Sequence, residues 1–250
     1  MIFQENFLLN SYKFLFVISL WVNFVDWNLT MNKLFNSSIG RKIAMALSGV
    51  FLIVFLTQHF LINITSVFSE GIFNMLSHFM GNNPLVQFIL QPILIVGVIF
   101  HFVMGFVLDW QNRKARPVKY AVYKGSRNSM FVSRNMIISG IVILSFLALH
   151  FYDFWVPEMD YKYIQVLPEN PDRYYEELIH KFENPVRVGL YCLSFIFLSL
   201  HLIHGLSSST QSLGTNNKYS STINKISYAF GIGIPAGFCF IALFHFFTHL

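Results

Sequence analysis

The sequence predicts an all-α membrane protein with five transmembrane helices, the first four of which form a bundle. Of its 250 residues, 54% are hydrophobic and only 12% are charged, whereas a soluble domain carries about 25% charged residues. Five apolar stretches also reach the roughly 20 residues that a helix needs to span a hydrocarbon core about 30 Å thick. This composition excludes a soluble enzyme, a disordered chain and a nucleic-acid-binding protein with a basic face.

The five apolar stretches are separated by polar segments and define the expected helices. They cover residues 43–68, 85–110, 131–155, 186–206 and 223–250. Pro84 and Pro185 stand at the expected starting turns, where a missing N–H costs least. Pro92 and Pro235 lie inside apolar runs, so we expect them to kink their helices.

Basic residues are distributed unevenly between the two sides of the membrane. Twelve Lys and Arg residues fall at the start of the first helix and in the connections after the second and fourth, against four on the other side. Because cytoplasmic segments are enriched in Lys and Arg, we expect the first helix to start in the cytoplasm. The short 69–84 loop, the acidic 156–184 loop and the C-terminus then lie outside. Residues 1–30 are expected to be an N-terminal extension to a membrane domain over residues 31–250.

Motifs for other kinds of cofactor are missing from the sequence. The two cysteines, Cys192 and Cys239, cannot build a disulfide framework, a zinc cluster or an iron–sulfur ligand set. There is no Gly-x-Gly-x-x-Gly and no Walker loop, so nothing suggests a bound nucleotide or flavin.

Four predicted helices each carry a histidine well inside the membrane, where ionisable residues are expensive and usually functional. Counted from the helix starts at about 1.5 Å per residue, His59 and His150 fall in the outer half, and His101 and His201 in the inner half. Two imidazoles that face each other across a four-helix core can hold a b-type haem. The pattern therefore predicts a haem-binding bundle with two stacked haems. The alternative is that each histidine is a buried polar group hydrogen-bonded to a neighbouring helix.

Glycines accompany the two inner histidines. Gly97 and Gly105 share a helix face with His101, and Gly205 stands in the same position after His201. They would leave a flat surface for a porphyrin, but Gly-x-x-x-Gly spacing is equally common in plain helix packing. His204 is an alternative to His201 as the ligand.

Several further motifs follow one another from Ile39 to the fourth helix. They are Ser38-Ile-Gly-Arg-Lys, Ser48-Gly-Val-Phe-Leu, Gln58-His59-Phe-Leu-Ile-Asn63, Glu70, Phe73-Asn74, His78-Phe-Met80, His101-x-x-x-Gly105, His150 and His201-x-x-x-Gly205. This ordered set resembles the cytochrome b558-type membrane anchor of succinate dehydrogenase and fumarate reductase, in its five-helix, di-haem form. Residues 1–30 fall outside the resemblance.

The resemblance implies two haem b groups, with His59 and His150 as iron ligands of one and His101 and His201 of the other. It also implies menaquinone as the quinone, and a flavoprotein and an iron–sulfur protein as partners in the bacterial inner (cytoplasmic) membrane. The chain has no motif for a flavin site or for an iron–sulfur cluster, which the two partners would supply. We therefore expect a subunit that transfers electrons and does not act on succinate by itself.

Quinone chemistry exchanges protons, and haem propionates need cations. Glu70 and His78, at the outer end of the bundle, are the candidates for proton exchange with a quinone; a solvated loop carboxylate is the alternative for Glu70. Candidates to pair with the propionates lie near the cytoplasmic ends, with topology-setting charge as the alternative for each: Arg41, Lys42, Arg113 and Arg134.

Two other functions stay open at the level of the sequence. One is the cytochrome b subunit of a different quinol-linked complex, of the nitrate reductase or hydrogenase type. The other is a cofactor-free transporter in which the histidines are only hydrogen-bonded. Four histidines on four separate helices argue against the first, and the absence of a b-type spectrum would indicate the second.

Overall fold

The computed structural model describes residues 37–115, 136–214 and 220–249, and these residues form helices and turns without a β-strand. The chain divides into two compact units, Met1–Ala44 and Met45–Leu250. Helix α2 (Ser38–Ile64) begins in the first unit and ends in the second. The predicted N-terminal extension, residues 1–30, lies outside the described residues.

Five helical segments in the described ranges are long and apolar enough to cross a membrane. They are Ser38–Val67, Val86–Lys114, Met136–Ile164, Pro185–Ser212 and Ser220–Thr248. Large apolar side chains such as Leu61, Val96 and Ile196 are more than half exposed on them, as expected for surfaces that contact lipid instead of water. The prediction of an all-α, five-helix membrane protein is confirmed.

The third span extends further than its hydropathy predicts. Its predicted start, Phe131, lies outside the described residues, and its helix continues past Trp155. Helix α7 (Met136–His150) is followed by a π-helical turn (Phe151–Trp155), α8 (Val156–Met159) and a second π turn (Asp160–Ile164). Charged residues do not end this helix because Glu158 and Lys162, one turn apart, pair at 2.5 Å.

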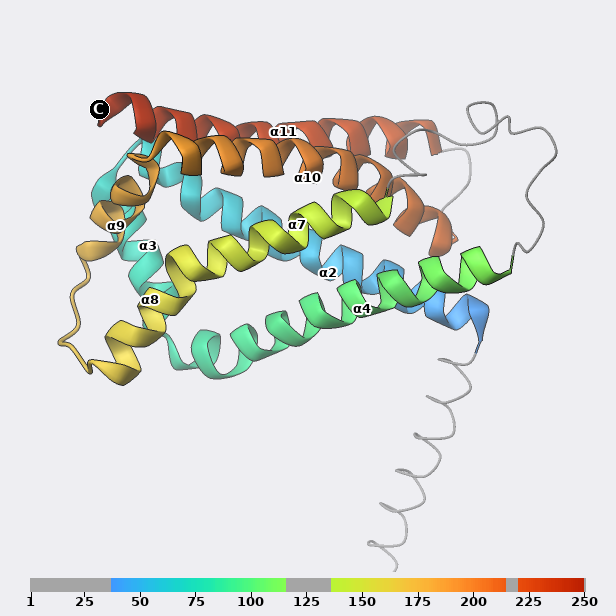
Figure 1. Ribbon diagram of the computed structural model, residues 1–250, viewed down its shortest axis with the longest axis horizontal. Helices are drawn as coiled ribbons and strands as arrows, with labels where there is room; N and C mark the ends of the chain where they lie inside the picture. Colours follow the sequence, from blue (N-terminus) through green and yellow to red (C-terminus); the bar gives the residue numbers. More distant parts are fainter. Residues whose placement is uncertain (1–36, 116–135, 215–219, 250) are drawn as a thin grey trace, which may run out of the picture. The chain divides into compact units, whose positions relative to one another are not determined.

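The two segments predicted as loops on the outer side contain helices. Residues 69–84 hold α3 (Glu70–Asn82), whose first turn is capped by the Ser69 hydroxyl accepting the N–H of Ile72. Residues 156–184 hold α9 (Arg173–Phe182), which is amphipathic and buries Leu178 and Phe182. Both helices lie at one end of the second unit (Figure 1), which we call the α3/α9 end.

The prolines of the apolar runs sit where the helices tolerate them. Pro185 is the first residue of α10 (Pro185–Ser212), after the N-cap Asn184. Pro92 is the second residue of α4 (Gln91–Lys114), directly after a π turn, so the irregularity that its missing N–H requires lies in that turn. Pro235 lies inside α11 (Ser220–Thr248), which continues through it as one helix.

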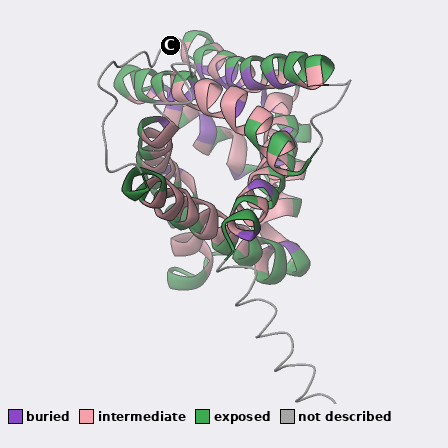
Figure 2. Ribbon diagram, turned by 90° about the vertical axis from the view of Figure 1, so that its right-hand side faces the viewer, coloured by how far each residue is buried: buried purple, intermediate pink, exposed green. Residues whose placement is uncertain are grey.

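Helix α10 is central to the packing of the second unit, because it contacts both α7 and α11. In Figure 1, α10 runs between α7 and α11, and the end-on view of Figure 2 shows buried residues concentrated along α10 and α11. A core cluster at the α3/α9 end joins Tyr191 and Phe195 of α10 to Phe238 of α11 and Phe182 of α9. The fifth span thus packs mainly on α10, and its Phe238 also lies against His59, with ring centroids 5.8 Å apart.

Candidate functional site: two histidine pairs and a polar cavity

The four histidines meet in two pairs, each between different helices. The ring centroids of His59, on α2, and His150, at the end of α7, lie 5.7 Å apart at an interplanar angle of 82°. Those of His101, on α4, and His201, on α10, lie 6.3 Å apart at 64°. These are the pairings that the positions along the predicted helices indicate, and His201, not His204, contacts the ring of His101.

The separation of the rings suits a metal ion between each pair. An imidazole nitrogen lies about 2 Å from a metal that it binds, so two rings on opposite sides of one ion have centroids about 6 Å apart. Both measured separations, 5.7 and 6.3 Å, are close to this value. Within the described residues, no group of three or more His, Cys, Asp or Glu side chains could hold a metal ion.

Two serines set the protonation of the His101/His201 pair. The Ser48 hydroxyl donates to the carbonyl of Met45 at 2.8 Å, and its oxygen lies 2.9 Å from Nδ1 of His101. When the hydroxyl proton points at that carbonyl, the oxygen accepts from His101 Nδ1–H. The neutral ring then has its lone pair on Nε2, which leaves that nitrogen free to accept a hydrogen bond or bind a metal ion.

Ser139 repeats this arrangement at His201. Its hydroxyl donates to the carbonyl of Met136 at 2.8 Å and its oxygen lies 3.1 Å from His201 Nδ1. In both cases the serine stands on the neighbouring helix and is followed by a glycine, Gly49 or Gly140. A Cβ atom on these glycines would lie 3.6 Å from Cε1 of His101 and 3.9 Å from Cε1 of His201, so each ring lies in ordinary contact with the glycine position.

The same order of residues recurs in α2 and α7. Each helix has a Met-x-x-Ser-Gly segment, then a phenylalanine, then the histidine four residues later. Phe55 stacks on His59 with centroids 5.5 Å apart, and Phe146 on His150 with centroids 5.7 Å apart. The site is therefore built twice from one helix-pair pattern, a repeat that the sequence contains and that the sequence analysis missed.

The three predicted glycines have different surroundings. A Cβ on Gly97 would lie 2.7 Å from the ring of Phe51, so this glycine admits an aromatic side chain of α2. Gly105 and Gly205 are again equivalent, because their Cβ atoms would contact the methyl groups of Met45 and Met136 at 3.7 and 3.6 Å. Close packing of α4 against α2 explains why position 97 is a glycine. Gly105 and Gly205 lie beside Met45 and Met136, which precede Ser48 and Ser139 by three residues.

The surroundings of the His59/His150 pair differ from those of the other pair. The Asn63 amide donates to the His59 carbonyl at 2.8 Å and lies 3.4 Å from the His59 Nδ1. Nδ1 of His150 is buried and has no hydrogen-bond partner among the described residues. Among the described residues, no serine contacts His59 or His150 as Ser48 and Ser139 contact His101 and His201.

A buried carboxylate close to this pair was missed by the sequence analysis. Asp153 lies in the π turn after His150 and is 1% exposed. Its Oδ2 accepts a hydrogen bond from the Tyr191 hydroxyl at 2.8 Å and lies 3.2 Å from Nε of Arg187. The signal was available, because an acidic residue inside the apolar run Phe-Tyr-Asp-Phe-Trp is costly without a role or a partner.

His245 on the fifth span is also buried, with 1% of its surface exposed. Its Nε2 lies 2.9 Å from the Ser66 hydroxyl, which donates to the Asn63 carbonyl at 2.7 Å. His249 stacks on it with ring centroids 5.8 Å apart. The contact between His245 and Ser66 ties α11 to the end of the first span.

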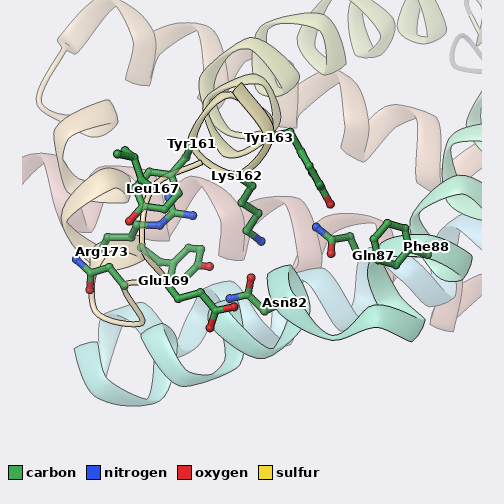
Figure 3. Close-up of a pocket in the computed structure, with 11 residues that line it drawn as sticks. Asn82, Gln87, Phe88, Tyr161, Lys162, Tyr163, Leu167, Glu169 and Arg173 are labelled. Atoms are coloured by element: carbon green, nitrogen blue, oxygen red, sulfur yellow. The ribbon is translucent and has the colours of Figure 1, made fainter. Parts of the chain in front are cut away.

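A polar cavity of about 320 Å³ opens at the α3/α9 end. Figure 3 shows tyrosine, lysine and arginine side chains around it from the π turn after α8 and from α9, and Asn82 from the end of α3. Arg173 is paired with Glu158 and Glu177 and stacks between the rings of Tyr161 and Tyr174.

The charges at this cavity are held in fixed states. Burial alone would lower the pKa of Arg173, but hydrogen bonds to Glu158 and Glu177 and their charges outweigh it and raise that pKa. Burial, followed by the charge of Glu158, raises the pKa of Tyr174 to about 12. At neutral pH the cavity therefore presents a permanent cation and a neutral phenol.

The two quinone-site candidates lie in different places on α3. His78 is at the rim of the cavity. The centroids of its ring and the Tyr174 ring lie 6.1 Å apart, and its Nε2 lies 3.9 Å from a carboxylate oxygen of Glu169. The Asn82 amide nitrogen lies 2.8 Å from its Nδ1. Glu70 is exposed at the start of α3, away from the cavity lining. Its charge, together with burial as the larger cause, raises the pKa of Tyr175.

The cationic candidates are only partly described. Arg41 and Lys42 belong to the first unit, and Arg134 lies outside the described residues, so their roles stay predictions. Arg113, in the last turn of α4, pairs with Asp109 at 2.7 Å.

No family model, curated protein or solved structure matches this chain. The fold and the site define a class: a multi-pass helical membrane protein in which two histidine pairs lie between the helices.

Proposed function

We propose that this chain is the membrane anchor and di-haem cytochrome b subunit of a succinate:quinone oxidoreductase. It would pass electrons between an iron–sulfur subunit and a quinone, menaquinone by the resemblance. The observation that carries the proposal is the geometry of the His101/His201 pair: ring centroids 6.3 Å apart, with each Nδ1 engaged by a serine so that each Nε2 has its lone pair free. The His59/His150 pair, with centroids 5.7 Å apart, supports a second haem.

The histidines would hold the two haem b groups, and the surrounding residues would orient them. When bound between two imidazoles, haem iron exchanges single electrons and has no open coordination site for other chemistry. Ser48 and Ser139 fix the tautomer and the rotation of the rings of His101 and His201, as partners of metal-binding histidines generally do. Phe55 and Phe146 restrict the rings of the other pair by stacking.

Quinone chemistry is assigned to the α3/α9 end. The cavity there is lined by aromatic rings together with polar groups, the combination expected of a site for a flat, oxygen-bearing ring. His78 contacts three of its lining residues and is partly accessible, so it can exchange a proton with a ligand. Glu70, at the start of the same helix, would exchange protons with water.

The partners and the location belong to the same proposal. A flavoprotein and an iron–sulfur protein would supply the succinate chemistry and the electron relay, for which this chain has no motifs. By the resemblance the chain would lie in a bacterial inner membrane. The uneven distribution of Lys and Arg supports an orientation with the first span starting in the cytoplasm and the C-terminus outside.

Removal of one histidine from each pair tests the proposal. The purified wild-type chain should show a dithionite-reducible b-type spectrum with two haems per chain, and His59→Ala and His101→Ala should each lose one, and a different one. His180→Ala is the matched control, since its side chain is 78% exposed and lies outside the spans. A colourless wild type would favour a cofactor-free membrane protein, and full haem content in both variants would exclude these ligands.

A further inference from the structure

Asp153 is an acidic side chain that the proposed electron transfer does not yet use. It lies three residues after His150, in a π-helical turn, and none of its side-chain surface is exposed. π turns inside α-helices occur frequently at functional sites. Here the turn begins directly after the residue proposed as an iron ligand and contains the buried carboxylate.

The carboxylate is held from one side only. The Tyr191 hydroxyl and Arg187 Nε both contact Oδ2, at 2.8 and 3.2 Å. Oδ1 is buried and has no hydrogen-bond partner within the described ranges. A buried oxygen without a donor is unfavourable by about 1–3 kcal/mol. We therefore expect a hydrogen-bond donor for Oδ1.

One buried nitrogen nearby is also without a partner. Nδ1 of His150 is buried and finds no hydrogen bond among the described residues. Both side chains lie against the same residue, because the Tyr191 ring is 6.3 Å from the His150 ring and its hydroxyl contacts Asp153. An imidazole whose Nε2 binds iron must carry its proton on Nδ1, which makes that nitrogen a donor and Asp153 Oδ1 the acceptor at hand.

We propose that Asp153 is a positioning residue for His150, whose Nδ1–H it accepts at Oδ1, directly or through one water molecule, while Tyr191 and Arg187 hold Oδ2. This inference rests on the proposed function. It makes the two haem sites chemically unequal: His101 and His201 donate to neutral serine oxygens, whereas His150 donates to a carboxylate. An anionic acceptor makes an imidazole a stronger electron donor and stabilises oxidised iron. The histidine ligands should therefore lower the midpoint potential of the His59/His150 haem more than that of the His101/His201 haem.

Two substitutions on one ion pair give opposite expectations. Asp153→Asn keeps an acceptor for Tyr191 but removes the charge, so the midpoint potential of one haem should rise while the other stays in place. Arg187→Gln removes the cation that partly neutralises the carboxylate, so the same haem should move to lower potential. A merely structural defect would lower haem content in both variants and would not shift the potential in opposite directions.

The measurement is a redox titration of the b-type spectrum of the purified chain, with the haem at issue identified by its absence from His59→Ala. Asp109→Asn is the matched control, an acidic residue of a span that is paired with Arg113 and lies outside both histidine pairs. If Asp153→Asn fails to fold, Arg187→Gln alone decides the sign, because Arg187 is 27% exposed. Unmoved potentials in a haem-loaded protein would overturn this inference alone, whereas a wild type without haem would overturn the proposed function and this inference with it.

Discussion

The hydroxyl oxygen of Ser139 lies 3.1 Å from Nδ1 of His201, although the two residues stand on different helices. The relationship of Ser48 to His101, at 2.9 Å, is the same. When each serine directs its own proton to the backbone carbonyl one turn earlier, each histidine donates from Nδ1. The protein therefore prepares two imidazoles in one tautomer before any ligand is considered.

The first prediction concerns these serines. Ser48→Ala or Ser139→Ala removes the acceptor and leaves a buried Nδ1–H without a partner, a change that should cost about 1–3 kcal/mol. We expect a lower thermal midpoint in detergent and a shift in the spectrum or potential of the His101/His201 haem only. Ser145→Ala is the control, since this serine is exposed on α7 and bonds only the Ile141 carbonyl. Equal effects of Ser139→Ala and Ser145→Ala would contradict the role given to Ser139.

The five spans could be predicted from the sequence because hydropathy over a window of a helix's length is a strong signal. Helices α3 and α9 could not, because each is short and half polar. Their burial depends on distant contacts, such as Asn74 donating to the Asp172 carbonyl at 3.1 Å and accepting the N–H of Tyr175 at 2.8 Å. A local pattern contains no information on such partners.

The pairing of the histidines followed from counting residues along helices, but their partners did not. Ser48 and Ser139 look like ordinary small residues until the neighbouring helix brings His101 and His201 beside them. The recurring Met-x-x-Ser-Gly segments were visible in the sequence and could have located them. Asp153 could have been singled out by its charge, whereas its bond to Tyr191 depends on how α7 and α10 pack.

A second prediction concerns the contact between α10 and α11. A Cβ on Gly231 would lie 2.9 Å from the backbone nitrogen of Ile203, so Gly231→Ala must push the helices apart. We expect a loss of about 1–3 kcal/mol, as for overpacking in other cores. Gly233→Ala, on the same helix, has nothing within 4 Å of its Cβ and should be neutral or more stable by up to about 1 kcal/mol. Thermal unfolding of the two variants in detergent measures the difference, and a Gly231→Ala protein as stable as Gly233→Ala would refute the close contact.

The third prediction is a pH dependence at the cavity. Burial and the charge of Glu158 raise the pKa of Tyr174 from 10.0 to about 12, so the folded protein favours the protonated phenol. The stability that this provides is fully present below pH 10 and is lost as the pH rises toward 12. Absorbance at the tyrosinate band should show one late ionisation that Tyr174→Phe removes. A wild-type titration identical to that of Tyr174→Phe above pH 10 would disprove the shift.

The last prediction concerns the cation at the centre of the α3/α9 end. Arg173 is 8% exposed, pairs with Glu158 and Glu177, and stacks between two tyrosine rings, so its loss removes several contacts at once. Arg173→Gln would leave Glu158, itself mostly buried, with Lys162 as its neighbouring cation at 2.5 Å. Removing one partner of a buried ion pair destabilises by about 3–5 kcal/mol, and because Lys162 remains we expect the lower end of that range.

The loss of Arg173 should also be local. Both histidine pairs are formed by other helices, so Arg173→Gln should keep its b-type spectrum while unfolding at lower temperature and binding a quinone analogue more weakly. Lys181→Gln on the same helix is the control, since Lys181 has no ion pair within the described residues. A variant with wild-type quinone-analogue affinity would separate the cavity from the quinone site, and one that lost both haems would show that α9 supports the histidine pairs as well.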